Sequence, residues 1–375
     1  MDKPETVEPL STIIDGPEGS EVLIFNEATT TELQVKCFKI VGASFGWPLP
    51  EADYIEREKF LMQRPLTHSN GVGIRWWCLQ VQGGDGSGRV VATCKTLNRD
   101  LLIRTAAGGT REGQGYCIGA VATDKRYRRL GLAEFLLRAV ARWMDGAGEA
   151  EASMLYSSIG KSVSLCLISP NRSGLPPTQP LMPEDIPALC ARDIENIKAK
   201  FSKDKPAADK ILMTTGAAFI SRKTNGEVPP FRGAINEYGK TWVYWHHDFP
   251  DRELTIQRVV TAAQATEDKE DEGQQIVTLA LASLLLAALD EAQKWKLHKL
   301  VIWNPTAELH HVIDFVQEQF GVDVINEERV NSNVPSVRWG GGNEDKTSEV
   351  VVYHKRILCL ELRASRSHCH HPLTR

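Results

Sequence analysis

The amino-acid sequence predicts an α/β (α+β) fold, in which helices flank a mixed, mainly antiparallel sheet. Residues 74–81 and 90–97 are apolar segments of strand length on either side of a glycine-rich turn, which is typical of an antiparallel hairpin. Residues 116–123 predict a third strand, and residues 133–144 place apolar side chains at the spacing of an amphipathic helix. A short apolar strand over residues 154–157 completes a strand–helix–strand unit.

The segment ahead of the hairpin predicts two helices. Residues 31–41 and 51–62 carry apolar side chains at helical spacing, and a turn rich in glycine and proline over residues 42–50 separates them. Residues 21–25 predict a single strand before both helices.

The second half of the chain repeats the outline of the first. It predicts a hairpin, a long apolar helix, a strand, another helix and a last strand, at residues 241–249 with 253–260, 276–295, 300–303, 308–320 and 350–357. Residues 262–275 are acidic and polar, so this half has no glycine-rich phosphate loop. A degenerate second copy of the first lobe and an unrelated lobe both remain open.

These elements divide the chain into four segments. A first lobe covers residues 20–161, an irregular insertion or linker covers 162–182, a second lobe covers 183–360, and a tail covers 361–375. The predicted linker is rich in proline and serine and has no stable period. The histidine- and cysteine-containing end of the tail predicts disorder rather than a metal site.

Composition excludes several classes of function. The 375-residue chain has a formal net charge of −4, so neither nucleic acid nor an anionic membrane is an expected partner. Its longest apolar stretch, residues 276–289, is too short to span a bilayer, and the N-terminus resembles no secretory signal, so we expect a cytoplasmic protein. The eight cysteines form no Cys-x-x-Cys pair, so we expect no metal and no disulfide framework.

Residues 121–133, with the sequence VATDKRYRRLGLA, carry the clearest functional signal. A predicted strand leads through a basic loop into the first turn of a helix. Backbone N–H groups at a helix start lack partners within the helix and lie at the positive end of its dipole, so they can hold a diphosphate. Gly131 permits phosphate oxygens to approach the backbone. Arg128 and Arg129 supply further positive charge beside this helix start, and Ala133 is small enough for a close approach.

A solvated basic turn ahead of a surface helix is the alternative explanation for this loop. The segment lacks the Gly-Lys-Ser/Thr ending of a Walker loop and has only one of the three glycines of a dinucleotide-binding fingerprint.

The loop resembles motif A of the GNAT N-acetyltransferase superfamily, Arg/Gln-x-x-Gly-x-Gly/Ala, which reads here as Arg128-x-x-Gly131-x-Ala133. The resemblance implies a GNAT-like fold with acetyl-CoA as co-substrate. It also implies that backbone groups of residues 121–123 contact the pantetheine arm and that residues 128–133 surround the diphosphate. The predicted cofactor-binding residues are therefore Val121, Ala122, Thr123, Arg128, Arg129, Leu130, Gly131, Leu132 and Ala133.

Other segments resemble the fungal lysine N6-acetyltransferase family, which transfers acetyl from acetyl-CoA to free L-lysine in lysine catabolism. The similar segments are FGWPL at residues 45–49, DY at 53–54, ERE at 56–58, PLT at 65–67, LYSSIGK at 155–161, PEDIPALC at 183–190 and LVIWNP at 300–305. The resemblance implies that the small-molecule amine substrate is L-lysine.

The pattern of that family breaks after Lys161. The resemblance leads us to expect an aromatic pair there, with a phenol that protonates the departing CoA thiolate, where this sequence has SVSLCL at residues 162–167. A genuine divergent loop and a mistranslated stretch over residues 162–181, such as a retained intron, both remain open.

No catalytic residue can be assigned from the sequence. A lysine ε-amine must lose a proton before it attacks a thioester, and backbone amides around Val121 and Ala122 would stabilise the resulting oxyanion. The candidates for the base, each of which can also be a structural or surface residue, are His246, His247, Asp248, His310, His311, Glu112 and Asp124.

Three functions therefore remain open. The leading one is acetylation of free L-lysine by direct attack of the neutral amine on the thioester. The others are acetylation of a protein, and CoA binding by a catalytically impaired pseudoenzyme.

Overall fold

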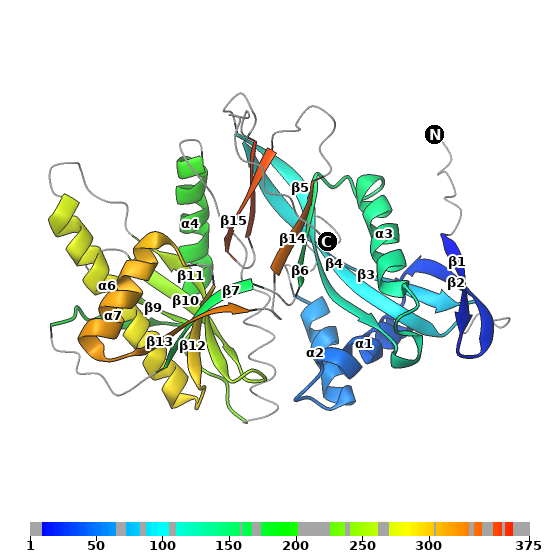
Figure 1. The fold of residues 1–375 in the computed structure, drawn as a ribbon, viewed down its shortest axis with the longest axis horizontal. Coiled ribbons are helices and arrows are strands. Elements are labelled where there is room, and N and C mark those ends of the chain that lie inside the picture. Colours follow the sequence, from blue (N-terminus) through cyan, green and yellow to red (C-terminus); the bar gives the residue numbers. More distant parts are fainter. Residues whose placement is uncertain are drawn as a thin grey trace.

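The computed structural model forms two sheets, each covered by helices, which lie side by side (Figure 1). It describes residues 10–64, 73–82, 88–104, 110–157, 160–166, 174–201, 226–236, 241–261, 270–303, 305–329, 334–339, 348–354 and 357–362. The end of the predicted tail and most of the acidic segment 262–275 lie outside these residues.

The first sheet contains nine strands among the described residues, seven of them in the order β1-β2-β3-β4-β5-β6-β14. Neighbours in this order are antiparallel except β5 and β6, which are parallel. β16 lies parallel to β4 and antiparallel to β15. The strands are β1 (Ser11–Gly16), β2 (Gly19–Glu27), β3 (Ile74–Val81), β4 (Val90–Arg104), β5 (Thr110–Thr123), β6 (Ala152–Ser157), β14 (Val334–Trp339), β15 (Ser348–His354) and β16 (Ile357–Leu362).

Helices pack on both faces of this sheet. They are α1 (Thr31–Phe45), α2 (Glu51–Met62) and α3 (Leu132–Asp145). Trp76 and Trp77 are adjacent on β3 and point to opposite faces, because side chains alternate along a strand. Trp76 packs edge-on against Phe38 of α1, whereas Trp77 contacts Trp143 of α3. Hence α1 and α2 share one face with Trp76, and α3 covers the other.

The second sheet has the order β13-β7-β12-β11-β10-β9-β8, in which β11 and β12 are parallel. Its strands are β7 (Gly160–Cys166), β8 (Thr178–Leu181), β9 (Gly233–Asn236), β10 (Thr241–Asp248), β11 (Glu253–Val260), β12 (Lys299–Trp303) and β13 (Asp323–Arg329). The helices of this half are α4 (Asp185–Phe201), α6 (Glu270–Lys294) and α7 (Ala307–Phe320).

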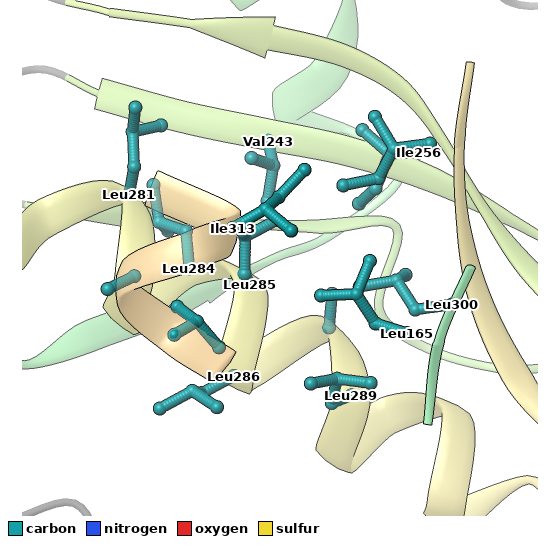
Figure 2. Packing of buried hydrophobic residues seen from close by; sticks show 14 of the residues in the cluster. Leu165, Val243, Ile256, Leu281, Leu284, Leu285, Leu286, Leu289, Leu300 and Ile313 are labelled. Carbon is teal, nitrogen blue, oxygen red and sulfur yellow. The ribbon is translucent and has the colours of Figure 1, made fainter. Parts of the chain in front are cut away.

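The core of the second half lies between α6, α7 and the sheet. Figure 2 shows leucines of α6 facing Val243 and Ile256 on the strands, with Ile313 of α7 beside them. Leu165 of β7 lies next to Leu300 of β12, its register partner, and both are fully buried. Because each such side chain stabilises the fold by roughly 1.5–3 kcal/mol, β7 is integral to this core.

Helix α6 is longer than the sequence predicts. Residues 273–294 are long and apolar enough to cross a membrane by length and composition alone. However, 72% of its apolar window is buried inside the protein. This burial against the second sheet accounts for the apolar composition of a core helix.

The two halves repeat one unit, as the sequence predicts. An antiparallel hairpin, a helix and a parallel strand occur as β4–β5–α3–β6 and again as β10–β11–α6–β12. This arrangement confirms the predicted α/β class, with a mixed, mainly antiparallel sheet and flanking helices in each lobe.

The structure corrects the expectation of an irregular linker over residues 162–182. Strand β7 lies between β12 and β13, and β8 pairs with β9. Residues 162–166 alternate polar and apolar side chains, which is a strand pattern that the surrounding prolines obscured. These pairings favour a genuine segment over a retained intron.

The last strands also depart from the predicted boundaries. β14, β15 and β16 lie within the predicted second lobe, residues 183–360, but belong to the first sheet. β14 pairs with β6, so the second half supplies strands to the first sheet, while β7, at the junction of the two halves, pairs with β12 in the second sheet.

Candidate functional site

The segment between β5 and α3 forms a firmly anchored loop. Asp124 caps the short 3-10 helix of residues 125–127, and its Oδ1 accepts a hydrogen bond from the backbone N–H of Arg126 at 2.9 Å. The side chain of Tyr127 is fully buried, and its hydroxyl donates to Glu21 at 2.9 Å. Burial and the Glu21 carboxylate raise the pKa of Tyr127, so the phenol stays protonated as a donor.

The start of α3 presents bare backbone to solvent. Gly131 is the N-cap residue with a φ of 75°, and no side chain caps the helix there. A Cβ added at Gly131 would meet no atom within 4 Å, so the surface above it is open. No side chain therefore competes with an anion for the first N–H groups of α3.

The basic residues of the loop lie around this helix start. Arg128, Arg129 and Leu130 are exposed, and Arg129 has a φ of 68°. Arg128 donates through Nε to the Thr123 carbonyl and through Nη2 to Ser44 Oγ of α1, both at 3.3 Å. Among the described residues, no carboxylate forms an ion pair with Arg128 or Arg129. Their charge is thus available to a diphosphate.

Other predicted residues of the loop anchor it. Leu132 is 3% exposed and belongs to the core beneath α3, and Ala133 is half-buried. The loop residues predicted from the sequence therefore surround one helix start, which favours their proposed role as a diphosphate site.

Strand β5 carries a bulge just before the loop. Thr93 of β4 pairs with Ala122, but Lys95 pairs with Gly119, so two residues of β5 face one of β4. Ala120, within the bulge, has a φ of 52°. A bulge leaves backbone groups outside the ladder and turns them toward a neighbouring space.

The parallel strands β5 and β6 stop pairing just before this bulge. The pairing of β5 with β6 ends at Ile118 and Leu155, although β5 continues to Thr123 and β6 to Ser157. One edge of residues 119–123 has no strand partner in the part of the chain that the structure describes. An extended ligand can pair with this edge and end at the start of α3.

Two of the predicted base candidates, Asp124 and Glu112, belong to the first half. Asp124 is the cap described above. Glu112 is exposed near the beginning of β5, so most of the strand separates it from the bulge. Asp124 Oδ1 is engaged by Arg126, and Glu112 lies near the opposite end of β5 from residues 119–122.

The histidine candidates belong to the second half. His246 and His247 are 5% and 2% exposed on β10, in the second sheet rather than at a surface edge. His247 Nε2 lies 3.0 Å from Glu291 Oε1. His310 and His311 are exposed on α7. The structure does not bring these four histidines to the loop of the first lobe.

A cavity of about 220 Å³ also lies in the second half. Trp245, Phe231, Glu291 and Lys294 contribute to its walls, which α6 and strands β8 to β10 provide. This cavity has aromatic and acidic walls, but its lining residues all belong to the second half and none to the β5–α3 loop.

The sequence did not single out a charged cluster on the α2 face of the first sheet. Glu58 of α2 is 2% exposed and contacts both Arg57 and Lys95. Burial alone would raise the pKa of Glu58, but the two cations outweigh it and hold that pKa below the usual range. Burial and the Glu58 charge raise the pKa of the neighbouring Tyr54. Glu58 and Lys95 are far apart in the sequence, and only the folded chain brings them together, so no sequence pattern marked this cluster.

Comparison with known proteins identifies the second half. The family model of the LYC1 GNAT-like C-terminal domain matches residues 162–356, which includes the segment that looked like a linker. No curated protein matches the chain.

Several solved structures have similar folds at low identity. A GCN5-related N-acetyltransferase from Kribbella flavida is 14% identical over 93% of this chain and 85% of that chain, with a TM-score of 0.47. A second one, from Anabaena variabilis, is 13% identical over 85% and 73%, with a TM-score of 0.49. Saccharomyces cerevisiae N-myristoyltransferase with bound myristoyl-CoA and inhibitors is 11% identical over 90% and 84%, with a TM-score of 0.49.

Proposed function

The chain belongs to the family of the LYC1 GNAT-like C-terminal domain, and so to the GNAT superfamily of acyl-CoA-dependent N-acetyltransferases, and we propose that it transfers acetyl from acetyl-CoA to the ε-amine of free L-lysine. The family match and the segments that resemble fungal lysine N6-acetyltransferases support this acceptor. The proposed CoA-binding residues are those of the β5–α3 loop.

One observation carries the proposal for the donor site: the open edge of β5 runs directly to the uncapped start of α3. The pantetheine arm of CoA would pair with residues 119–123, and its diphosphate would accept hydrogen bonds from the first N–H groups of α3. Arg128 and Arg129 would add charge-assisted contacts to the phosphates.

The bulge would hold the reacting carbonyl. The neutral ε-amine attacks the thioester carbon, an N–C bond forms, and the carbonyl oxygen becomes an oxyanion. The backbone N–H groups around Val121 and Ala122 would stabilise that oxyanion. The C–S bond then breaks, CoA leaves as a thiolate, and the proton lost by the amine passes through water to solvent or to the thiolate.

The test is the release of CoA thiol from acetyl-CoA by the full chain, measured with no acceptor, with L-lysine and with a lysine-containing polypeptide. We expect release that depends on L-lysine, and N6-acetyl-lysine in the product by mass spectrometry. Turnover with the polypeptide alone would replace the proposal with protein acetylation. Binding of acetyl-CoA without turnover of either acceptor would indicate a pseudoenzyme.

A further inference from the structure

A row of three side-chain positions crosses the first sheet beside the bulge. Trp76 of β3 pairs with Lys95 of β4, and Lys95 pairs with Gly119 of β5. Register partners point to the same face, and Trp76 packs against α1, so the whole row faces α1 and α2. Gly119 directly precedes Ala120, the bulge residue with positive φ.

Helix α2 places a buried carboxylate over this row. Glu58 Oε2 lies 3.1 Å from Lys95 Nζ, and Glu58 Oε1 contacts Arg57 Nη1. The Lys95 ammonium also lies 5.1 Å from the centre of the Trp76 ring. Glu58 and Trp76 thereby fix the position of the ammonium group.

The cluster has more positive charge and more donors than its own carboxylate can use. Two cations, Arg57 and Lys95, share one anion, Glu58. Arg57 Nε is buried and has no hydrogen-bond partner. Lys95 and Arg57 are nevertheless 22% and 20% exposed, so a ligand can reach them. An anion that brings further acceptors would satisfy these donors.

The sheet is open next to the cluster. A Cβ added at Gly119 would meet no atom within 4 Å, so a ligand can lie on the strand there. Adjacent strands lie about 4.8 Å apart, which places Gly119 within reach of the Lys95 side chain. A molecule whose amine reaches the bulge can thus direct a second group toward Lys95 and Arg57.

We propose that Lys95 and Arg57, held in place by Glu58, form the subsite that binds the carboxylate of a free amino-acid acceptor. The inference rests on the proposed acetyltransferase function and adds the class of acceptor: an amine that carries a free carboxylate. The four-carbon chain of L-lysine separates its ε-amine from the α-carbon and lets the two ends reach different subsites. Lys95 and Arg57 determine specificity, and Glu58 is a positioning residue.

The experiment compares acceptors that differ only at the carboxylate. We measure kcat and KM for L-lysine, L-lysinamide and 1,5-diaminopentane with the wild-type chain and with Lys95→Met. Loss of one charge-assisted contact should raise KM for L-lysine by about 10- to 100-fold. The KM for the two acceptors without a carboxylate should change less than about twofold. Lys95→Arg should restore most of the preference for L-lysine, because it retains the charge.

Lys39→Met is the matched control. Lys39 of α1 also pairs with a glutamate of α2, Glu51, at 3.3 Å, but both side chains are more than half exposed. This variant should keep the wild-type KM for all three acceptors. Thermal unfolding of both variants separates a loss of binding from a loss of folding.

Two results would overturn the inference and leave the proposed function intact. One is that the wild-type chain acetylates L-lysine and L-lysinamide with equal kcat/KM. The other is that Lys95→Met reduces kcat/KM for L-lysine and for L-lysinamide by the same factor. If no amine is acetylated, the proposed function fails first. Calorimetric titration with L-lysine and L-lysinamide then decides whether the carboxylate subsite exists, since equal affinities would refute it.

Discussion

The two halves place a β-bulge at the same position of their repeated unit. In the first half, pairing of β5 with β6 ends at Ile118, and the bulge begins at Ala120, after Gly119. In the second, pairing of β11 with β12 ends at Ile256, and Gln257 is the additional residue of a shift against β10. The bulge and the separation of the parallel strands therefore belong to the architecture and do not by themselves make a cofactor site.

The side chains at the two bulges differ. In the second half, Gln257 is 3% exposed and lies 2.6 Å from His246 Nδ1, and Arg258 pairs with Asp193 of α4 at 2.8 Å. In the first half, Gly119 and Ala120 leave the strand open. The polar side chains at the second bulge are engaged with partners inside the protein, whereas small residues leave open space beside the first.

The helices that follow differ as well. α3 begins after Gly131 in a basic loop, whereas α6 begins with Glu270, Asp271 and Glu272. Acidic residues stabilise a helix start through the dipole but repel a diphosphate. The proposed CoA site therefore depends on the chemistry of the loop before the helix, and this difference can be tested in both lobes.

The largest effect is expected for Gly131→Val. Valine is strained at a φ of 75°, at a cost of about 1–3 kcal/mol, and its side chain would occupy the space above the helix start. We expect CoA affinity to fall by about 100-fold in calorimetric titration.

Gly321→Val is the control for that variant. Gly321 ends α7 with a φ of 63° and open space around it, so valine is similarly strained in the other half. It should lower thermal stability but leave CoA affinity unchanged. An equal loss of affinity in both variants would contradict a role for the β5–α3 loop.

A smaller effect, on stability, is expected when the polar side chain at the second bulge is replaced. Gln257→Leu removes a buried hydrogen bond and should lower the free energy of unfolding by about 1–3 kcal/mol in urea titrations. CoA affinity should not change.

Gly119→Ala in the first half should leave the free energy of unfolding unchanged and reduce the rate of acetyl transfer, because the added methyl group narrows the space beside the bulge. The reverse pattern would show that the two bulges have the opposite roles.

The smallest expected effect is the pH dependence of stability that His247 contributes. Burial lowers the pKa of His247 below its usual value, although the Glu291 carboxylate acts in the opposite direction. The unfolded chain binds this proton more readily, so stability is fully present above about pH 6.5 and falls as the pH drops toward the folded-state pKa. Unfolding titrations at about pH 7.5 and about pH 5.5 should show this loss. In His247→Gln the loss should be smaller, and an unchanged pH dependence would refute the assignment.

Local signals predicted much of the first half. The helix over residues 51–62 has the predicted bounds, and the loop before α3 lies where its glycine and basic residues indicated. The repeat in the second half was also visible, because an amphipathic or apolar helix between short strands leaves a periodic pattern.

Features that depend on strand pairing could not be predicted. Residues 160–166 form an interior strand of the second sheet only because β12 and β13 lie on either side of them. Likewise, Lys95 and Glu58 are distant in sequence, and only the register and the position of α2 bring them together. His246 and His247 looked equally suited to a surface or a site, because burial is set by α6 and the sheet.

The positions of β7 and β14 in the two sheets limit how the chain can be divided into fragments. A fragment that stops at residue 161 would lack β14 and expose the outer edge of β6 to other chains. A fragment that starts at residue 167 would lack β7 and leave β12 and β13 without the strand between them. Neither portion contains a complete sheet, so the lobe that carries the β5–α3 loop depends on strands that follow the whole second sheet in the sequence.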